Sequence, residues 1–179
     1  MNNDVINFGS YWQKSDKNFG KQPIEWYIVA REDNDLLLLS KYALSGVYYG
    51  YKYSEDWKHS IAREWMAQFV EDAFDRYERS VLVQYRNMDD NLIDTAFLLS
   101  YAELRYYHVL ENLEVMRCFP TPFAQKRLFI DSDLKTCEWW LRSYGSNDYI
   151  GYKGKIGYYA TPQETECGIR PAVWMRLGR

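Results

Sequence analysis

The stretch Glu138-Trp139-Trp140-Leu141-Arg142-Ser143 sets the class of the fold, because the helical spacing of apolar residues ends before it. From this point the chain consists of short aromatic and β-branched runs, separated by turns that contain Gly, Asn or Pro. Such runs are typical of antiparallel strands. We therefore predict four short strands, at 138–143, 148–152, 155–160 and 169–177.

Helices are expected in the middle of the chain. Ser60 is a good N-cap, and the apolar residues after it have helical spacing, which predicts an amphipathic helix. The side chains expected to face the core are Ile61, Trp65, Phe69 and Val70. A strand over 94–99 leads to a capping-box pattern at Ser100–Glu103, which predicts a second helix as far as Tyr107. Thr121-Pro122 predicts a short third helix over 122–126.

A β-hairpin is expected near the N-terminus, after a short strand at 6–8. The run Pro23–Ala30 is rich in β-branched and aromatic residues, and the polar turn 31–34 separates it from Leu36–Ser40. The order hairpin, helices, antiparallel strands indicates an α+β fold. No repeat or linker divides the chain, so we expect one domain over residues 1–179, with two or three helices on a twisted antiparallel sheet.

The composition is that of a globular domain with an unusual number of aromatic rings. The 179 residues are 47% hydrophobic and 26% charged, enough for a sizeable core in a single unit. Aromatic residues make up 18%, with 7 Trp, 17 Tyr and 8 Phe. This content argues against a disordered segment, a coiled coil or a collagen-like rod. The tyrosines exceed what a core needs, so some rings are expected near the surface.

Charge and cysteines bear on partners and location. The formal charge of -3 gives no general attraction for nucleic acid or an anionic membrane, and no apolar run approaches the roughly 20 residues that span a bilayer. Three widely spaced cysteines, Cys118, Cys137 and Cys167, are typical of reduced, buried thiols. With no signal-peptide pattern at the start, we expect a cytoplasmic protein without nucleic-acid or membrane partners.

Several motifs together resemble a bacterial domain family of unknown function. The two most specific are Trp139–Ser143 and Gly168-Ile169-Arg170-Pro171-Ala172-Val173-Trp174, and weaker ones are Pro23–Trp26, Phe97–Ser100 and Arg117-Cys118. Their order is also similar to a distant C-type-lectin-like fold, as used by the formylglycine-generating, sulfatase-modifying enzymes. The resemblance implies this fold and supplies no catalytic residues.

Two arginines in the specific motifs allow two interpretations. Strand alternation places Arg142 on the face of Trp140, opposite Trp139, Leu141 and Ser143. Arg170 shares a face with Ala172 and Trp174. The two guanidinium groups together suit an anion or carboxylate. Alternatively, each stacks on a ring and bonds to backbone carbonyls or a buried carboxylate, which is the interpretation that we favour.

The densest tyrosine cluster is Val47–Tyr53, which contains Gly50 and therefore suggests a loop or a strand bend. Exposed rings with a polar tip are good stacking surfaces for sugars, peptides or another protein. In the alternative interpretation, alternate tyrosines fill the core. The candidate ligand-binding residues are Tyr48, Tyr49, Tyr51, Tyr53, Arg142, Tyr144, Asn147, Asp148 and Tyr149.

Catalytic and metal chemistry find little support in the sequence. His59 and His108 lack the spacing of zinc ligands, and Cys137 and Cys167 do not match the formylglycine-generating enzyme's motif. Ser146-Asn147-Asp148 lacks the signatures of calcium-dependent lectins, and nucleophile elbows and phosphate loops are missing. We expect no catalytic residue, metal or cofactor, and predict a non-catalytic module that binds a protein or glycan. The alternatives are a divergent enzyme of the formylglycine-generating type and a structural homo-oligomer subunit.

Overall fold

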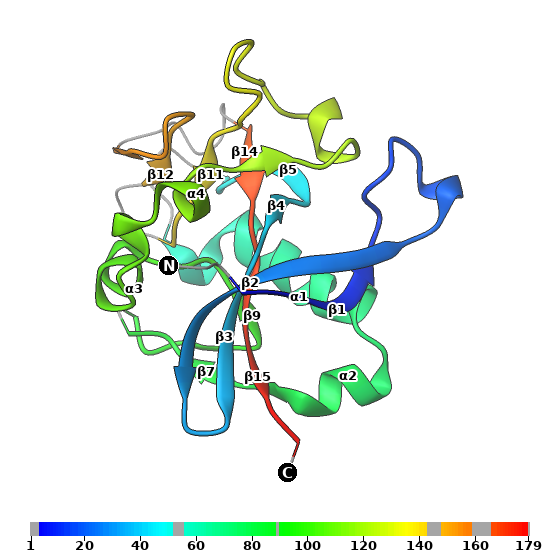
Figure 1. Cartoon of the computed structure of the whole chain (residues 1–179), viewed down its shortest axis with the longest axis vertical. Coiled ribbons are helices and arrows are strands. Elements are labelled where there is room, and N and C mark those ends of the chain that lie inside the picture. The colour runs from blue at the N-terminus through cyan, green and yellow to red at the C-terminus, as the bar shows by residue number, and fades with distance from the viewer. Residues whose placement is uncertain (1–3, 52–55, 89, 143–147, 159–165, 179) are drawn as a thin grey trace.

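Two β-sheets form the framework of the chain in the computed structural model, which describes residues 4–51, 56–88, 90–142, 148–158 and 166–178 (Figure 1). The strands of the larger sheet are β1 (Val5–Tyr11), β2 (Gln22–Glu32), β3 (Asp35–Ser40), β15 (Ala172–Arg176) and β6 (Leu82–Val83), in this spatial order, with β9 (Ala96–Phe97) also paired to β15. The strands of the second sheet are β13 (Ile156–Gly157), β12 (Tyr149–Ile150), β11 (Trp139–Trp140), β14 (Glu166–Ile169) and β5 (Ser45–Tyr48), again in spatial order.

Smaller elements complete the α+β fold. The short strand pairs are β10 (Phe119–Pro120) with β4 (Tyr42–Ala43) and β7 (Tyr85–Arg86) with β8 (Ile93–Asp94). The α-helices are α1 (Ile61–Ala73), α2 (Arg76–Val81), α3 (Tyr101–Tyr106) and α4 (Leu113–Met116). Single 3₁₀ turns are η1 (Lys17–Phe19), η2 (Trp57–His59), η3 (Val109–Glu111) and η4 (Ala124–Lys126). Strand pairing is antiparallel except at β4–β10 and β11–β14.

The predicted N-terminal hairpin is confirmed. Strands β2 and β3 pair antiparallel, and the polar turn between Glu32 and Asp35 connects them. Asp33 adopts φ 49° there, a conformation that Asp tolerates better than most residues. The four leucines of β3 are at most 3% exposed, so both faces of this central strand are covered.

The predicted strand 169–177 is wrong in one respect, since the structure breaks it at Arg170-Pro171. Strand β14 before the break belongs to the second sheet, and β15 after it belongs to the larger sheet. Pro171 has no N–H to donate to a ladder, and its carbonyl accepts from the Ser40 amide at 2.9 Å. This segment therefore joins the two sheets, and Arg170 does not share a strand face with Trp174.

Helix α1 begins where the sequence predicts, and its buried face differs from the predicted one. The Ser60 hydroxyl accepts from the Arg63 amide at 3.1 Å. The buried residues of the helix are Ala62, Met66, Phe69 and Ala73. Ile61, Trp65 and Val70 are half-buried, although the Trp65 ring still packs against Phe69 at 5.2 Å between centroids. Ala62 and Ala73 are small and let the helix approach the sheet closely. The predicted face consisted of large apolar residues and left these alanines out.

The remaining helices are shorter and more numerous than predicted. The capping box of α3 is present, with Ser100 and Glu103 bonding each other's backbone amides. Asp75 and Asn112 cap α2 and α4, which the sequence did not reveal because each helix has at most six residues. The predicted helix 122–126 is reduced to the single turn η4, and the predicted strand 94–99 to the short strands β8 and β9.

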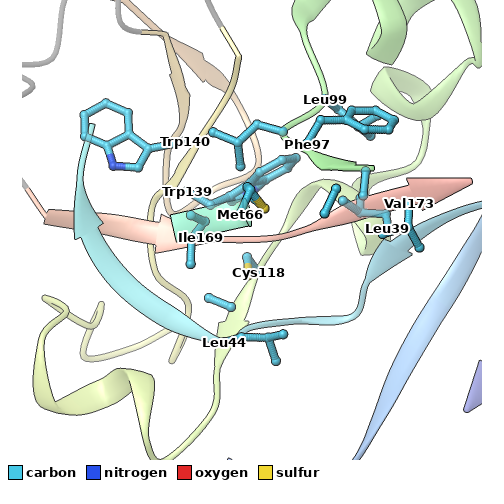
Figure 2. Packing of buried hydrophobic residues seen from close by; sticks show 14 of the residues in the cluster. Leu39, Leu44, Met66, Phe97, Leu99, Cys118, Trp139, Trp140, Ile169 and Val173 are labelled. Atoms are coloured by element: carbon cyan, nitrogen blue, oxygen red, sulfur yellow. The ribbon is translucent and has the colours of Figure 1, made fainter. Parts of the chain in front are cut away.

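The core spans both sheets. Trp26, Trp57, Trp139 and Trp140 are at most 1% exposed. Figure 2 shows Leu39, Phe97 and Val173 of the larger sheet near Trp139 and Ile169 of the second. One continuous set of apolar side chains thus holds the two sheets together. No helix in the described part of the chain has the length and apolar character needed to cross a membrane.

Candidate binding surface

The predicted tyrosine cluster divides between the core and the surface. Tyr49 is fully buried, and its ring meets that of Trp140 edge-on at 5.4 Å between centroids. Tyr48 at the end of β5 is 38% exposed, and Tyr51 beyond it is 60% exposed. Tyr49 therefore fills the core, whereas Tyr48 and Tyr51 have the exposure that a binding surface requires. Tyr53 lies outside the described residues.

A side-chain hydrogen bond holds Tyr51, and the pairing of β5 with β14 holds the backbone of Tyr48. The Tyr51 hydroxyl is 2.9 Å from the Glu64 carboxylate on α1, a hydrogen bond that links the loop to the helix. Tyr48 stands opposite Glu166 in the β5–β14 ladder, and Glu166 pairs with Arg127. The tyrosines are thus carried on elements that the core holds in place.

Gly46 allows β5 to run where it does. A Cβ at this position would lie 2.7 Å from the Leu128 side chain and 2.9 Å from Cβ of Arg127. Real Cβ atoms essentially never come so close, so only glycine permits the segment after η4 to cover the strand here. Close packing of this kind gives Tyr48 a rigid base.

The second predicted segment is only partly described and lies apart from the first. Tyr144 and Asn147 are outside the described residues, while Asp148 and Tyr149 are half-buried. The Asp148 carbonyl accepts from the Leu141 amide at 2.9 Å. Strands β11 and β14 lie between β12 and β5, so three strand spacings, about 14 Å in all, separate the strand of Tyr149 from the strand of Tyr48. The two segments therefore do not form one small pocket.

Tyr149 has a structural role in its own strand pair. Its ring covers Gly157 of β13, where a Cβ would lie 2.3 Å from Cζ of the tyrosine. Burial, followed by the charge of Glu138, raises the pKa of the Tyr149 hydroxyl above its usual value. The glycine opposite the ring makes this cross-strand packing possible.

Arg142 is engaged inside the protein. It is 2% exposed, and its Nη2 lies 2.7 Å from Oε1 of the buried Glu103. Its Nη1 donates to the Leu98 carbonyl at 2.9 Å, and the guanidinium lies 5.6 Å from the Phe97 ring centroid. This geometry agrees with the structural interpretation of Arg142, in which its partners are an aromatic ring and a buried carboxylate.

Arg170 is buried at a different place. Its Nε and Nη1 donate to the carbonyls of Ser40 and Val115 at 2.9 and 2.7 Å, and the guanidinium lies 4.6 Å from the Trp139 ring centroid. Arg170 thus ties β3 to α4, whereas Arg142 ties the segment after β11 to α3. The two side chains do not converge on a shared anion site.

The three cysteines are buried to 1% exposure as free thiols. Cys118 and Cys137 face each other in an isolated antiparallel bridge, with the Cys137 amide 2.8 Å from the Cys118 carbonyl. The Cys118 thiol and burial raise the pKa of Cys137, and burial raises the pKa of Cys167. Burial opposes ionisation of Cys118, but the hydrogen bond with Cys137 and the charge of Arg170 outweigh it and lower the pKa of this thiol. Reactive cysteines combine a lowered pKa with exposure, and Cys118 is 1% exposed.

The histidines do not assemble a metal site in the described part of the chain. His59 pairs with Asp56 at 2.8 Å, and His108 with Glu111 at 3.3 Å. Among described residues, no three His, Cys, Asp or Glu side chains lie close enough to hold a metal ion.

A hollow on the larger sheet was not predicted from the sequence. It has a volume of about 350 Å³ and lies between β2 and residues 107–115. Its walls include Tyr27 and Val29 on β2, and Val29 lies where the β2–β3 register shifts. His108 on the other wall adopts φ 57°. Bulges and left-handed residues leave no periodic signal, which explains why the sequence did not reveal this hollow.

Together these features define an α+β domain with two linked sheets, a continuous apolar core rich in aromatic residues, and several aromatic rings exposed at its surface. Residues 33–177 match the model of a family described as a domain of unknown function (DUF6273), and the chain belongs to this family. No curated protein and no solved structure matches the chain. Strands β1 and β2 both precede the matched residues, although β2 pairs with β3 inside them.

Proposed function

We propose that this chain is a non-catalytic binding module that recognises a glycan or a protein through exposed tyrosines, chiefly Tyr48 and Tyr51. The observation that carries the proposal is the division of the tyrosine cluster. Tyr49 anchors the segment in the core against Trp140, while Tyr48 and Tyr51 present their rings to solvent. Such an arrangement keeps recognition rings in place before a ligand arrives.

The chemistry of the two rings suits either ligand class. A tyrosine offers a large apolar face and a hydroxyl while losing little conformational freedom on binding. At Tyr51 the hydroxyl is already bonded to Glu64, which fixes the ring and leaves a carboxylate beside it. A ring next to a carboxylate suits the apolar face and hydroxyls of a sugar, or an amide-bearing peptide.

We also propose two finer assignments. A C-type-lectin-like relationship is supported by the order hairpin, helices, antiparallel strands and by the presence of β1 and β15 in one sheet. A reducing, cytoplasmic environment is supported by the facing free thiols of Cys118 and Cys137. The first assignment concerns evolutionary relationship and the second concerns cellular location. The proposed binding through Tyr48 and Tyr51 depends on neither.

A glycan array tests the sugar branch of the proposal. The labelled wild-type chain is compared with the double variant Tyr48→Ser/Tyr51→Ser and with a control that removes two exposed tyrosines elsewhere, Tyr77→Ser/Tyr101→Ser. Tyr77 on α2 and Tyr101 on α3 are 77% and 41% exposed. The control therefore removes a similar amount of exposed ring surface to that removed by Tyr48→Ser/Tyr51→Ser. We expect array binding to disappear in the first double variant and to remain in the control.

Other outcomes assign the surface differently. Equal loss of array binding in both double variants contradicts the proposed site. Wild-type chain that binds no glycan removes the sugar branch and leaves a protein ligand. Light scattering tests a third possible ligand. If the wild-type chain is a dimer and only Tyr48→Ser/Tyr51→Ser is a monomer, the ligand is a second copy of this chain.

A further inference from the structure

The connection between β1 and β2 carries lysines that lie over aromatic rings. Nζ of Lys17 and Nζ of Lys21 are 4.1 and 4.6 Å from the Trp12 ring centroid, and Lys14 lies 5.7 Å from Phe19. Cation–π contacts occur about once per 70–80 residues in proteins, so three lysines over two rings within ten residues is an unusual concentration. We call residues 12–21 the lysine arm. Figure 1 shows this arm projecting from the sheet.

Hydrogen bonds make the arm rigid. The Gln13 side chain donates to the carbonyls of Gln22 and Pro23 at 2.9 and 2.8 Å. The Gln22 side chain in turn accepts from the Gln13 amide at 3.0 Å and donates to the Gly20 carbonyl at 2.7 Å. These bonds hold the backbone that carries the lysines in one conformation.

Contacts with the body of the protein hold the arm in one position. The Phe123 amide donates to the Gln13 carbonyl at 3.1 Å, and Lys17 also lies 6.0 Å from the Phe123 ring centroid. Lys21 donates to the backbone carbonyl of Asp72 at the end of α1. Lys17 thus sits between two rings from distant parts of the sequence.

The positive charge of the arm is not neutralised by carboxylates. None of the ion pairs between described residues involves Lys14, Lys17 or Lys21. Asp16, the one acidic residue of the arm, accepts from the Asn18 amide at 2.8 Å and caps η1. Two ammonium groups held at one indole repel each other, and an anion bound close to both of them offsets that repulsion.

We propose that the lysine arm is a docking surface for an acidic segment of a partner protein, whose carboxylates bind Lys17 and Lys21. The arm carries three lysines and one aspartate on a chain whose net charge is -3. Phe19 is 61% exposed beside the lysines and adds an apolar contact for a side chain of the same segment. Because the ammonium groups are already fixed, little conformational entropy is lost when the segment binds.

An acidic protein segment fits the arm better than nucleic acid does. Single-stranded nucleic acid binds by stacking its bases on aromatic faces. The Trp12 ring is already occupied by two ammonium groups, so it offers no free platform. A long polyphosphate chain also meets the net negative charge of the rest of the protein, whereas a short acidic segment contacts only the arm.

A binding titration with a fluorescein-labelled hexaglutamate peptide at about 50 mM salt tests this proposal. The lysine variant is Lys17→Gln/Lys21→Gln, and the control is Lys58→Gln/Lys153→Gln, which removes two exposed lysines elsewhere. We expect the lysine variant to weaken peptide binding about tenfold and the control to leave it unchanged. Binding should also weaken as salt is raised.

A second variant separates the rings from the charge. Trp12→Leu keeps every lysine and removes the indole that positions two of them, and we expect it to weaken peptide binding while equal melting temperatures show that the fold is intact. Wild-type chain that does not bind hexaglutamate overturns the proposal, as does equal weakening in the control. Tighter binding of a thymidine oligonucleotide, or of inorganic pyrophosphate, also overturns it and assigns the arm to nucleic acid or to a small anion.

Discussion

The guanidinium of Arg142 and the carboxylate of Glu103 form an ion pair in which both side chains are at most 1% exposed, with 2.7 Å between Nη2 and Oε1. The other carboxylate oxygen of Glu103 accepts from the Ser100 amide at 2.8 Å, which completes the cap of α3. One carboxylate therefore connects two sequence motifs that lie about forty residues apart, the capping box and the Trp-Trp-Leu-Arg stretch.

Removing one partner of this pair leaves the other buried without its counter-charge. We expect Glu103→Ala to lower the free energy of unfolding by about 3–5 kcal/mol, as measured by urea denaturation. Glu111→Ala is the control, because the Glu111 side chain is 70% exposed. The double variant Glu103→Leu/Arg142→Met should be more stable than either single one. A loss below about 1 kcal/mol in Glu103→Ala would contradict a structural role for the pair.

Arg170 should not tolerate replacement by lysine. Its planar fork donates to two carbonyls at once while it stacks on Trp139, and a lysine ammonium cannot reproduce that geometry. We expect Arg170→Lys to cost about 3 kcal/mol or more in the free energy of unfolding. Arg176→Lys, at a solvent-exposed pair with Asp35, should change it by less than about 1 kcal/mol. Similar effects of the two substitutions would show that the fork is not needed.

The three cysteine thiols should not react with a dye in the folded protein. Cys118, Cys137 and Cys167 are each 1% exposed, so a dye in solution cannot reach them in the folded chain. Burial also contributes to the raised pKa of Cys137 and Cys167. We expect a thiol-reactive dye such as DTNB to label none of the three in native protein and all three in denaturant. Rapid labelling of the native protein would disprove this burial, and incomplete labelling in denaturant would reveal a disulfide.

Alkaline pH should destabilise the fold through Tyr11. Burial, followed by the charge of Asp72, raises the pKa of its hydroxyl from 10.0 to about 12. The unfolded chain ionises first, so the stability is complete below pH 10 and is lost as the pH rises from 10 to about 12. The loss due to this group is about 2–3 kcal/mol. Urea denaturation across this range should show a smaller loss in Tyr11→Phe, and an unchanged loss would rule out Tyr11 as the cause.

The fold class and the individual strong elements could be predicted from the sequence. The Asp-Asn turn and its flanking apolar runs gave the β2–β3 hairpin, and Ser60 and Ser100 gave the starts of α1 and α3. These signals are local, because a cap or a turn depends on residues a few positions apart. The rotated face of α1 and the short helix α4 depend on tertiary packing, and no local pattern encodes them. Pro171, by contrast, is a local signal against a continuous strand, and the predicted strand 169–177 did not take it into account.

The candidate site was predictable only in part, for a related reason. Composition showed that the tyrosines exceed the needs of a core, yet alternation alone did not say that Tyr49 turns inward. The lysine arm was missed because its order comes from the Gln13–Gln22 side-chain bonds and from Phe123. Side-chain networks between distant residues leave no periodic trace in a sequence.

The most direct measurement of the proposed binding function is photo-crosslinking in the cells that produce the protein. A benzophenone-bearing residue is placed at Tyr51, which is 60% exposed, and in a separate chain at Tyr77 on α2, which is 77% exposed. Benzophenone inserts into C–H bonds of sugars and proteins alike, so the result does not depend on the ligand class. Our account predicts a discrete adduct from position 51 and none from position 77. The same adduct pattern at both positions, or no adduct at position 51, would contradict it.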